Sequence, residues 1–562
     1  MPRRAGRRLA LAAALTIIGS GLAPVGASAA APAPSEPRIT TAAAFDVSPP
    51  LRELATATVP GTAGVTGAER AERGAVPSDK GFQGDGAVRG AATDRRAQDP
   101  LEQISPPRIN FEGVANSANP TLISPPDPDG DVGPNHYVQV VNVQYSVYTK
   151  TGLRLVGPAQ IGTLFAGFPI EDCTGFNGDP IVLHDQAADR WLITQFTVDG
   201  PEFWNCVAIS TTPDPTGTYF RYAFSTGPNF PDYPKYGVYP DSYFISTREF
   251  APDDSFFGIG AYALEKQRML AGDPNARALS FVLPPGDAPY LTGDGLLPTD
   301  WDGPRPPRRG TPNWFVGTMD DGGPYGAPFD ALNVFEFNVD WRPTPRATFG
   351  LAAQIPVASF DSIFPCNPPP DTRDCIPQPG TANKLDILSY RQRPTWRLAY
   401  RNFGTYESLV TNQSVEARPG EAGVRWYELR RPRGAAAPSL FQQGTFAPGD
   451  GVHRWMGSIA QDKNGNLALG YSVSNGTDVF PGIRYTGRLA GDPAGTMARG
   501  EQTLINGSGV QLVSSRWGDY TALHVDPVDD CTFWYTNEYF ATSSNNGWQT
   551  RIGSFKFPSC RF

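Results

Sequence analysis

Asp526-Pro-Val-Asp-Asp530, followed directly by Cys531-Thr-Phe-Trp-Tyr535, is one of four copies of the pattern that decides the fold. The other copies also start with Asp, reach Asn or Asp four residues later and precede a strand-like run: Asp131-Val-Gly-Pro-Asn135, Asp185-Gln-Ala-Ala-Asp189 and Asp462-Lys-Asn-Gly-Asn466. An Asp at the start of a turn accepts backbone N–H bonds, and Asn or Asp at its end tolerates unusual dihedrals. Each copy is therefore interpreted as the hairpin between two strands of one repeating β-unit.

Looser copies extend the repeat along the chain. They lie at Asp232–Ser246 and Asp386–Tyr400, with a degenerate copy within residues 300–340. Short alternating or apolar runs separated by turn residues indicate an all-β fold with little helix. Seven units of about 60 residues predict a seven-bladed β-propeller, although six or eight blades also fit. The last strand, near residues 551–557, needs a partner from the front of the fold, and Ile109–Gly113 would close the ring.

The N-terminal part of the chain has a different composition. Four arginines between residues 3 and 8 precede an apolar run and a small-residue stretch, which predicts a secretory signal peptide over residues 1–30. Residues 31–105 contain no Trp, Tyr or Cys, so they offer too little apolar surface to offset the entropy of ordering. We expect a disordered leader there, a propeller domain over residues 106–562 and a secreted, extracellular protein without a membrane span.

The charge balance argues against nucleic acid as a partner. The formal net charge is −9, and removal of the four arginines of residues 1–30 takes it to about −13. Binding to nucleic acid needs clustered Lys and Arg that neutralise phosphates, and anionic membranes are disfavoured for the same reason.

The six cysteines are even in number, which in an exported chain predicts three disulfides. We expect them to pair in sequence order: Cys173 with Cys206, Cys366 with Cys375, and Cys531 with Cys560. A metal site is the alternative, but the chain has no C-x-x-C motif and only four His.

No familiar catalytic motif is present, so function is sought in the geometry of the repeat. An Asp stands about 10 to 15 residues before the aromatic residue of several second strands. These positions are Asp127, Asp179, Asp232, Asp386 and Asp519, with Asp302 as a weaker sixth and Ser458 in the remaining unit. In a propeller such residues would gather at one mouth of the central channel.

Two interpretations of these carboxylates stay open. In the functional one, Asp179, Asp232 and Asp519 are catalytic groups acting on a glycan, since paired carboxylates perform acid, base or nucleophile chemistry at glycosidic bonds. The substrate-binding residues would be Tyr233, Tyr239, Arg454, Trp455, Arg516, Trp517 and Tyr520. In the structural one, a repeated Asp caps its own loop or bonds the backbone of the next blade.

Calcium is the one cofactor that the sequence suggests, and otherwise none is expected. Asp127-Pro-Asp129-Gly-Asp131 places alternate oxygens as a calcium loop does, but the distal Glu of a full EF-hand loop is missing. A plain turn explains the same residues.

Two stretches carry a resemblance to known proteins. Asp179-Pro-Ile-Val-Leu-His-Asp185 with Arg190-Trp191, and Arg516-Trp-Gly-Asp-Tyr-Thr-Ala-Leu-His-Val-Asp526, resemble secreted bacterial propellers of the sialidase-like and arabinanase-like kind. The Asp-box of true sialidases is absent, so the resemblance implies fold and export rather than activity. We expect a propeller that binds or cleaves an extracellular polysaccharide, as a glycoside hydrolase or polysaccharide lyase or as a lectin-like module. A non-catalytic propeller that binds surface proteins, as an adhesin or scaffold, is the alternative.

Overall fold

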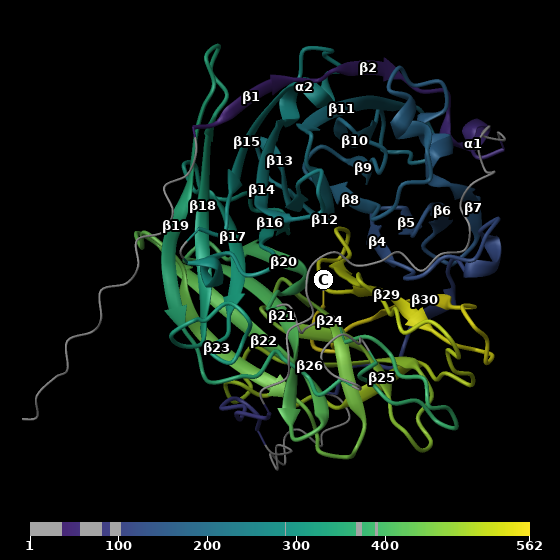
Figure 1. The fold of residues 1–562 in the computed structure, drawn as a ribbon, viewed down its shortest axis with the longest axis vertical. Coiled ribbons are helices and arrows are strands. Elements are labelled where there is room, and N and C mark those ends of the chain that lie inside the picture. Colours follow the sequence, from purple (N-terminus) through teal and green to yellow (C-terminus); the bar gives the residue numbers. More distant parts are fainter. Residues whose placement is uncertain are drawn as a thin grey trace, which may run out of the picture.

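Seven blades, each built on a four-stranded antiparallel meander, surround a central axis, and their colours follow the chain around the ring (Figure 1). The computed structural model describes residues 36–56, 81–89, 103–286, 288–366, 374–387 and 392–561. Within each sheet the strands follow one another from the axis outward, and each innermost strand contacts those of the neighbouring blades, with β28 contacting β4. The prediction of an all-β, seven-bladed propeller is confirmed.

Blades 1 to 4 are formed by the first half of the chain. Blade 1 contains β4 (Asp129–Val132), β5 (His136–Val141), β6 (Gln144–Thr149) and β7 (Arg154–Gln160). Blade 2 contains β8 (Ile181–Asp185), β9 (Arg190–Phe196), β10 (Phe203–Ser210) and β11 (Tyr219–Gly227). Blade 3 contains β12 (Phe230–Val238), β13 (Ser242–Phe250), β14 (Phe256–Glu265) and β15 (Arg277–Leu283). Blade 4 contains β16 (Leu297–Asp302), β17 (Asn313–Met319), β18 (Ala331–Asp340) and β19 (Arg346–Pro356).

Blades 5 to 7 complete the ring. Blade 5 contains β20 (Thr395–Asn402), β21 (Tyr406–Arg418), β22 (Glu421–Pro432) and β23 (Ser439–Phe446). Blade 6 contains β24 (His453–Gln461), β25 (Leu467–Ser474), β26 (Gly482–Arg488) and β27 (Glu501–Ile505). Blade 7 contains β28 (Ala522–Val525), β29 (Phe533–Tyr539), β30 (Gln549–Phe555) and, from the front of the chain, β3 (Ile109–Glu112).

Two pairings join the blades into a closed ring. β3 pairs antiparallel with β30, with Ile109 opposite Ser554, so the predicted closure by residues near 109–113 is confirmed. β16 and β20 pair in parallel, with Thr299 opposite Leu398, and this fuses blades 4 and 5 into one eight-stranded sheet. Pairing at these two places leaves fewer open strand edges, which otherwise invite aggregation.

Described parts of the N-terminal leader lie against the outside of the ring. β1 (Arg38–Thr41) pairs with β15 of blade 3, and β2 (Ala44–Val47) pairs with β11 of blade 2. Further along, Asp85 forms a buried ion pair with Arg425 of blade 5 at 2.7 Å. The expectation of a leader without structure therefore does not extend to residues 36–56 and 81–89, because strand pairing and one buried ion pair supply what their composition lacks. The predicted signal peptide lies outside the described residues.

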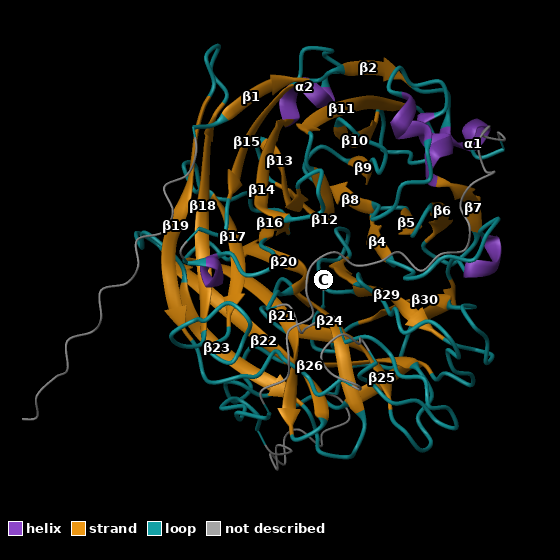
Figure 2. Ribbon diagram, in the orientation of Figure 1, coloured by secondary structure: helices purple, strands orange, loops and turns teal. Residues whose placement is uncertain are grey.

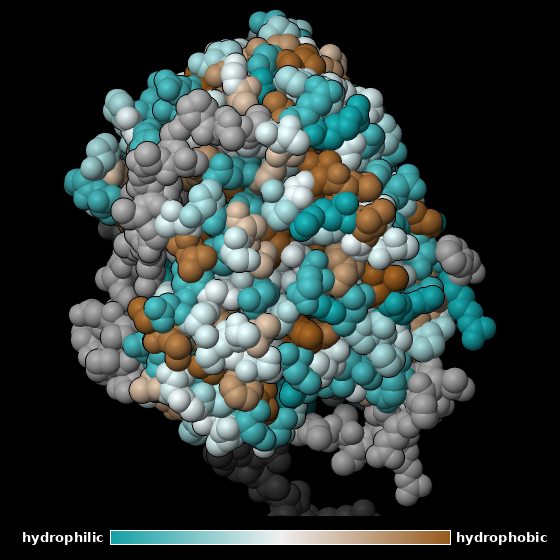
Figure 3. Space-filling view, turned by 90° about the vertical axis from the view of Figure 1, so that its right-hand side faces the viewer, coloured by the Kyte–Doolittle hydropathy of each residue, from teal (hydrophilic) through white to brown (hydrophobic). Residues whose placement is uncertain are grey.

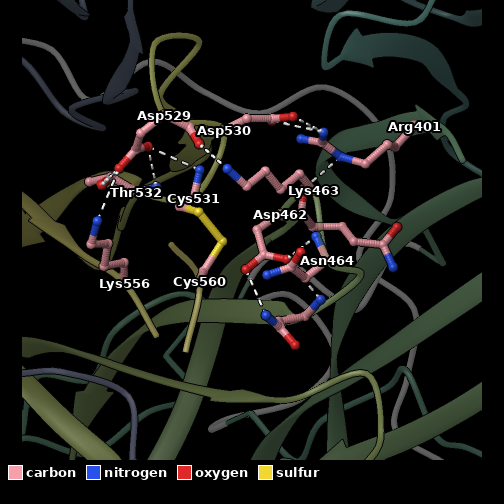
Figure 4. The surroundings of a disulfide bond; sticks show 12 residues. Arg401, Asp462, Lys463, Asn464, Asp529, Asp530, Cys531, Thr532, Lys556 and Cys560 are labelled. Atoms are coloured by element: carbon pink, nitrogen blue, oxygen red, sulfur yellow. Dashed lines mark hydrogen bonds and ion pairs between the residues drawn. A yellow bond between two sulfur atoms is a disulfide. The ribbon is translucent and has the colours of Figure 1, made fainter. Parts of the chain in front are cut away.

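The hairpin turns between the first and second strands lie together at one end of the ring. Asp462 accepts hydrogen bonds from the backbone N–H of Asn464 and Asn466 at 2.9 and 3.0 Å, as expected for an Asp that starts a turn. Asp530 ends the β28–β29 turn with a φ of 54° and pairs with Arg401 of blade 5 (Figure 4). The repeated turns thus also link neighbouring blades, and we call this end of the ring the hairpin face.

All three predicted disulfides are confirmed. Cys173 pairs with Cys206, Cys366 with Cys375, and Cys531 with Cys560, the last beside the turns of blades 6 and 7 (Figure 4). The described chain has no free cysteine. Three disulfides are compatible with an extracellular location.

In the described parts of the chain, helices are few and short (Figure 2). They are α1 (Leu51–Leu54), α2 (Lys266–Leu270) and the 3₁₀ turns η2 (Asn116–Ala118), η3 (Ile161–Phe165), η4 (Glu171–Thr174) and η5 (Pro289–Leu291). Among the described residues, no helix has the length and apolar character needed to cross a membrane.

Candidate functional site

A left-handed backbone conformation recurs where the innermost strands begin. Six blades carry a non-glycine residue with positive φ near this point: Asp127 (44°), Asp179 (44°), Tyr233 (52°), Gln392 (53°), Met456 (49°) and Asp519 (64°). Such φ values are uncommon outside glycine and persist only where the surrounding structure enforces them. The six residues lie at the end of the ring opposite the hairpin face, and we call this end the channel mouth.

Three blades bring the predicted catalytic carboxylates together at the mouth. Tyr520 of blade 7 places its hydroxyl 3.1 Å from Oδ2 of Asp179 in blade 2 and 3.0 Å from the carbonyl oxygen of Pro234 in blade 3. The Tyr233 hydroxyl donates to the carbonyl oxygen of Asp519 at 2.9 Å. Together Asp179, Asp232, Tyr233, Lys235, Asp519 and Tyr520 form what we call the mouth cluster.

Lys235 lies at the centre of the mouth cluster. Its Nζ is 3.0 Å from the ring centroid of Tyr233 and 3.7 Å from that of Tyr520, so the ammonium group faces two aromatic rings. It also donates to the carbonyl oxygens of Tyr233 and Pro234 at 3.4 and 3.3 Å. Only 1 % of Lys235 is exposed. Burial lowers the pKa of Lys235 well below its usual range, although the nearby Asp179 acts in the opposite direction.

Arginines hold two of the three predicted carboxylates in place. Arg248 pairs with Asp232 at 2.8 Å and with Asp294 at 3.1 Å. Arg516 pairs with Asp519. Charge-assisted bonds of this kind are shorter and stronger than neutral ones and fix the carboxylates in one orientation.

The mouth cluster has acidic groups outside and basic groups inside. The side chains of Asp232 and Asp519 are 20 % and 12 % exposed, and Asp179 is half-buried. Arg248, by contrast, is 2 % exposed. A ligand that approaches from solvent therefore meets the partly exposed carboxylates of Asp179 and Asp232 first, which are acceptors for hydroxyl groups.

Burial also raises the pKa values of the tyrosines and the glutamate that lie behind the carboxylates. It raises the pKa of Tyr233 and of Tyr520 above the usual range. Glu538 of β29, which accepts a bond from the Gly518 N–H at 2.9 Å, has its pKa raised well above normal by burial, and the neighbouring Asp519 adds to the effect. The buried Glu538 thus lies behind Asp519.

The architectural role that a repeated Asp was expected to play falls to other residues, deeper in the channel. Asp129 accepts from the Val182 N–H at 2.8 Å, and Asp131 accepts from the His184 N–H at 2.7 Å, both in the next blade. Asp300 of blade 4 accepts from the Val238 N–H of the preceding blade at 3.0 Å. Inter-blade backbone bonding therefore does not account for Asp232 and Asp519, whose side chains pair with arginines.

Two of the aligned positions are corrected. Asp302 lies at the last residue of β16, toward the hairpin face, where it pairs with the buried Arg397 at 2.6 Å. Trp396 lies on the innermost strand β20 rather than on a second strand, so Asp386 is not equivalent to the other Asp residues. Asp386 nevertheless reaches the mouth, since its Oδ2 is 3.8 Å from Nε of Arg516.

Four predicted substrate-binding residues lie away from the mouth surface. Trp455 and Trp517 are fully buried against each other, with ring centroids 5.7 Å apart, so neither has a face free for a sugar. Tyr239 is buried in the core between blades 3 and 4, and its hydroxyl donates to Pro312. Arg454 is buried in blade 6, paired with carboxylates of that blade. Their aromatic or basic character serves packing, which a sequence pattern does not separate from binding.

Two carboxylates of the expected calcium loop already accept hydrogen bonds from the protein. Besides its backbone bond, Asp129 accepts from Trp396 Nε1 at 3.2 Å, and Asp131 lies 3.1 Å from Nδ1 of His524. Acidic groups close enough to share a cation lie elsewhere in the described chain, at Asp300, Asp302 and His524 and at Asp320, Asp321 and Asp330. In the first of these groups Arg397 already pairs with both carboxylates.

Sequence reasoning missed the basic half of the site. Lys235 follows Asp232-Tyr-Pro in a stretch already assigned to a blade, and its inward position on β12 is the signal that would have found it. Arg248 lies on β13, and Arg393 lies in the segment before β20. Neither arginine follows the repeat, so only the fold brings them to the mouth.

Comparisons with known proteins add a likeness of fold. No model of a known family and no curated protein matches the sequence. Among solved structures, an α-L-arabinanase from Penicillium chrysogenum shares 9% identity over 82% of this chain and 98% of its own, with a TM-score of 0.33. An α-L-arabinofuranosidase from Fusarium graminearum shares 9% identity over 85% and 99%, with a TM-score of 0.34. An exo-β-1,3-galactanase from Clostridium thermocellum shares 10% over 81% and 99%, with a TM-score of 0.28. At these values we draw nothing about activity from them, and the argument for function rests on the mouth cluster.

Proposed function

We propose that this protein is an extracellular propeller that engages a carbohydrate at its channel mouth, with Asp179, Asp232 and Asp519 contacting the sugar. The observation that carries the proposal is the convergence of these three carboxylates, from three blades, in one cluster at the mouth. Carboxylates held by arginines accept bonds from sugar hydroxyls in a fixed geometry, which is how a rigid site selects a polyhydroxylated ligand.

The same arrangement supports a catalytic version of the proposal. Hydrolysis of a glycosidic bond needs one ionised carboxylate and one group that gives a proton. Asp179, which faces the Tyr520 hydroxyl, and Asp519, which faces Arg516, have different surroundings, as such a division requires. The catalytic reaction would be glycoside hydrolysis or polysaccharide lysis, and we assign cleavage to these two residues.

A second candidate function is binding of a surface protein. Three exposed apolar side chains lie next to the mouth: Leu122 (43 %), Leu512 (43 %) and Val513 (68 %). Their loops meet where Ser124 and Ser514 approach to 3.2 Å. On the side of the molecule drawn in Figure 3, apolar residues are spread among polar ones.

One experiment separates these functions. The mature protein is screened against cell-wall, plant and host polysaccharides, with binding and release of reducing ends read on the same samples. Asp179→Asn is compared with Asp189→Asn, a matched control in the same blade at the hairpin face, where Asn tolerates the φ of 51°. Binding that Asp179→Asn alone abolishes supports the proposal, and release that it abolishes makes the protein an enzyme. No binding to any polysaccharide would move the function to protein recognition.

A further inference from the structure

Arginines gather on the hairpin face of blades 4 and 5, in three segments of the chain. The segments are the β16–β17 turn (303–311), the β20–β21 turn (402–406) and the stretch from the end of β22 to the start of β23 (430–441). Together they contain no Asp or Glu and six arginines: Arg305, Arg308, Arg309, Arg430, Arg431 and Arg433. In a chain with a formal net charge of −9 this is a local reversal of sign. We call the three segments the arginine patch.

The β20–β21 turn lies at the centre of the patch and contacts the other two segments. Arg308 donates to the carbonyl oxygen of Gly404 at 2.7 Å, and the Arg305 guanidinium fills the space where a Cβ at position 404 would stand. On the other side, the N–H of Arg433 donates to the carbonyl oxygen of Thr405 at 3.1 Å. The three segments therefore form one continuous surface, and a single ligand can reach arginines of two blades.

Buried glutamates offset only part of the positive charge of the patch. Arg430 pairs with Glu428 and Arg431 pairs with Glu407, each at 2.6 Å, and both glutamate side chains are fully buried. Four arginines form no ion pair with a carboxylate of the described chain: Arg305, Arg308, Arg309 and Arg433. Six arginines less two glutamates leave four positive charges, and three of these arginines are exposed to solvent.

An aromatic stack runs through the patch and ends at the surface. The rings of Phe403 and Tyr406 stack with their centroids 5.0 Å apart. The Arg430 guanidinium lies 4.3 Å from the ring centroid of Tyr406 and 3.4 Å from that of Phe441. Phe441 is 50 % exposed, so the stack presents an apolar ring to solvent beside the arginines.

We propose that the arginine patch is a second binding site, separate from the channel mouth, for an acidic polysaccharide whose sugars carry carboxylates. The planar guanidinium fork of arginine matches a carboxylate with two parallel hydrogen bonds. The exposed Phe441 ring supplies an apolar surface for the C–H groups on one face of a sugar. A polymer of uronic acids offers both groups in each sugar, and the patch offers both partners side by side.

Nucleic acid fits the patch less well than such a polysaccharide. Double-stranded DNA carries one negative charge per ~1.7 Å of its axis, and its affinity comes from many phosphate contacts at once. Four arginines supply few such contacts, and the acidic remainder of the protein repels a dense polyanion.

Polygalacturonate tests the site, with its methyl ester as the uncharged counterpart. Affinity of the mature protein for each polymer is measured by calorimetry in about 50 mM and about 300 mM sodium chloride. Polygalacturonate is expected to bind more weakly at the higher salt concentration, and to bind about tenfold more tightly than the ester at the lower one. Equal affinities for the two polymers, or no binding of polygalacturonate, would overturn the proposal.

A triple variant locates the binding. Arg305→Gln, Arg309→Gln and Arg433→Gln together remove three exposed charges without opening the core. They are expected to weaken polygalacturonate binding about tenfold, because each exposed ion pair contributes modestly. Unchanged affinity in this variant would contradict the assignment.

The matched control removes the same charge elsewhere. Arg52→Gln, Arg108→Gln and Arg154→Gln replace three exposed arginines outside the patch and are expected to keep the wild-type affinity. An equal loss in both triple variants would show that net charge alone attracts the polymer, which overturns the proposal.

The aromatic ring has its own test. Phe441→Ala is expected to weaken polygalacturonate binding about threefold at both salt concentrations, because the contribution of the ring carries no charge. Unchanged affinity would overturn the assignment to a polysaccharide. Single-stranded DNA that binds more tightly than polygalacturonate, and that the arginine variant no longer binds, would assign the patch to nucleic acid instead.

Asp179→Asn separates this site from the proposed function at the mouth. Full polygalacturonate affinity in Asp179→Asn, with loss in the arginine variant, supports a separate site, and it does so even if no neutral polysaccharide binds and the proposed function fails. Loss in Asp179→Asn with full affinity in the arginine variant would place the acidic polymer at the mouth. That result would keep the proposed function and overturn the second site.

Discussion

Substitution of the buried Glu249 by Gln changes how the stability of the propeller depends on pH. Glu249 of β13 is fully buried, and its Oε1 accepts bonds from Thr247 at 2.9 Å and from Tyr262. Burial raises its pKa from 4.5 to about 7, against these two bonds. The difference corresponds to about 3 kcal/mol of unfolding free energy, which is present below pH 4.5 and lost as the pH rises through 7.

The amide introduced by Glu249→Gln keeps the acceptor oxygen and cannot ionise. The variant should therefore match the wild type near pH 4.5 and exceed it at pH 8, by about 3 °C in melting temperature for a domain of about 460 residues. Thermal unfolding monitored by circular dichroism across this pH range measures the difference. A variant that is less stable than the wild type at pH 8, or a difference that does not change with pH, would refute the reasoning.

Three further predictions concern the framework. Arg397→Met should destabilise the protein by about 3–5 kcal/mol, because it leaves Asp300 and Asp302 buried without their cation; chemical denaturation measures this, and a loss below about 1 kcal/mol contradicts it. Asp85→Ala should cost a similar amount through its fully buried partner Arg425, with protease sensitivity of the N-terminal segment as a second readout, and unchanged stability would show that the segment does not support blade 5. Removal of calcium with a chelator should leave the melting temperature unchanged, because backbone and ring N–H groups already bond the carboxylates of Asp129 and Asp131; a fall of more than about 2 °C would show a bound calcium ion, at this loop or at the Asp320, Asp321 and Asp330 group.

The fold was largely predictable from the sequence because its decisive features are local. A turn that begins with Asp and ends with Asn or Asp depends on hydrogen bonds within five residues, and it can be identified without knowledge of distant contacts. The blades with strict turns were placed correctly from this pattern. Blade 5 was misaligned because its innermost strand carries Trp396, an aromatic residue that elsewhere marks the second strand.

The site was predictable only in its acidic half. Asp179 and Asp519 belong to the repeat, so their meeting at one end of the ring follows from the repeat itself. Lys235 and Arg393 reach the same place through β12 and through an irregular segment before β20, and nothing in the local sequence links them. The exposure of single side chains was unpredictable for the same reason. Trp517 is two residues from Asp519 in the sequence, but its ring packs against Trp455 and is buried.

Ordering of the N-terminal segment shows the limit of composition as a guide. Residues 38–47 have too few apolar side chains to fold alone, yet their backbone pairs with two outer strands. Strand addition uses main-chain groups that every residue possesses, so composition does not reveal it.

The most direct test of the central claim is the dissociation constant of the best-bound polysaccharide fragment for the wild type, Asp179→Asn and Asp189→Asn, measured by calorimetry. The two substitutions make the same chemical change at opposite ends of blade 2. Location of the site at the channel mouth predicts at least tenfold weaker binding in Asp179→Asn and unchanged binding in Asp189→Asn. Equal affinities for all three proteins, or weaker binding only in Asp189→Asn, would contradict it.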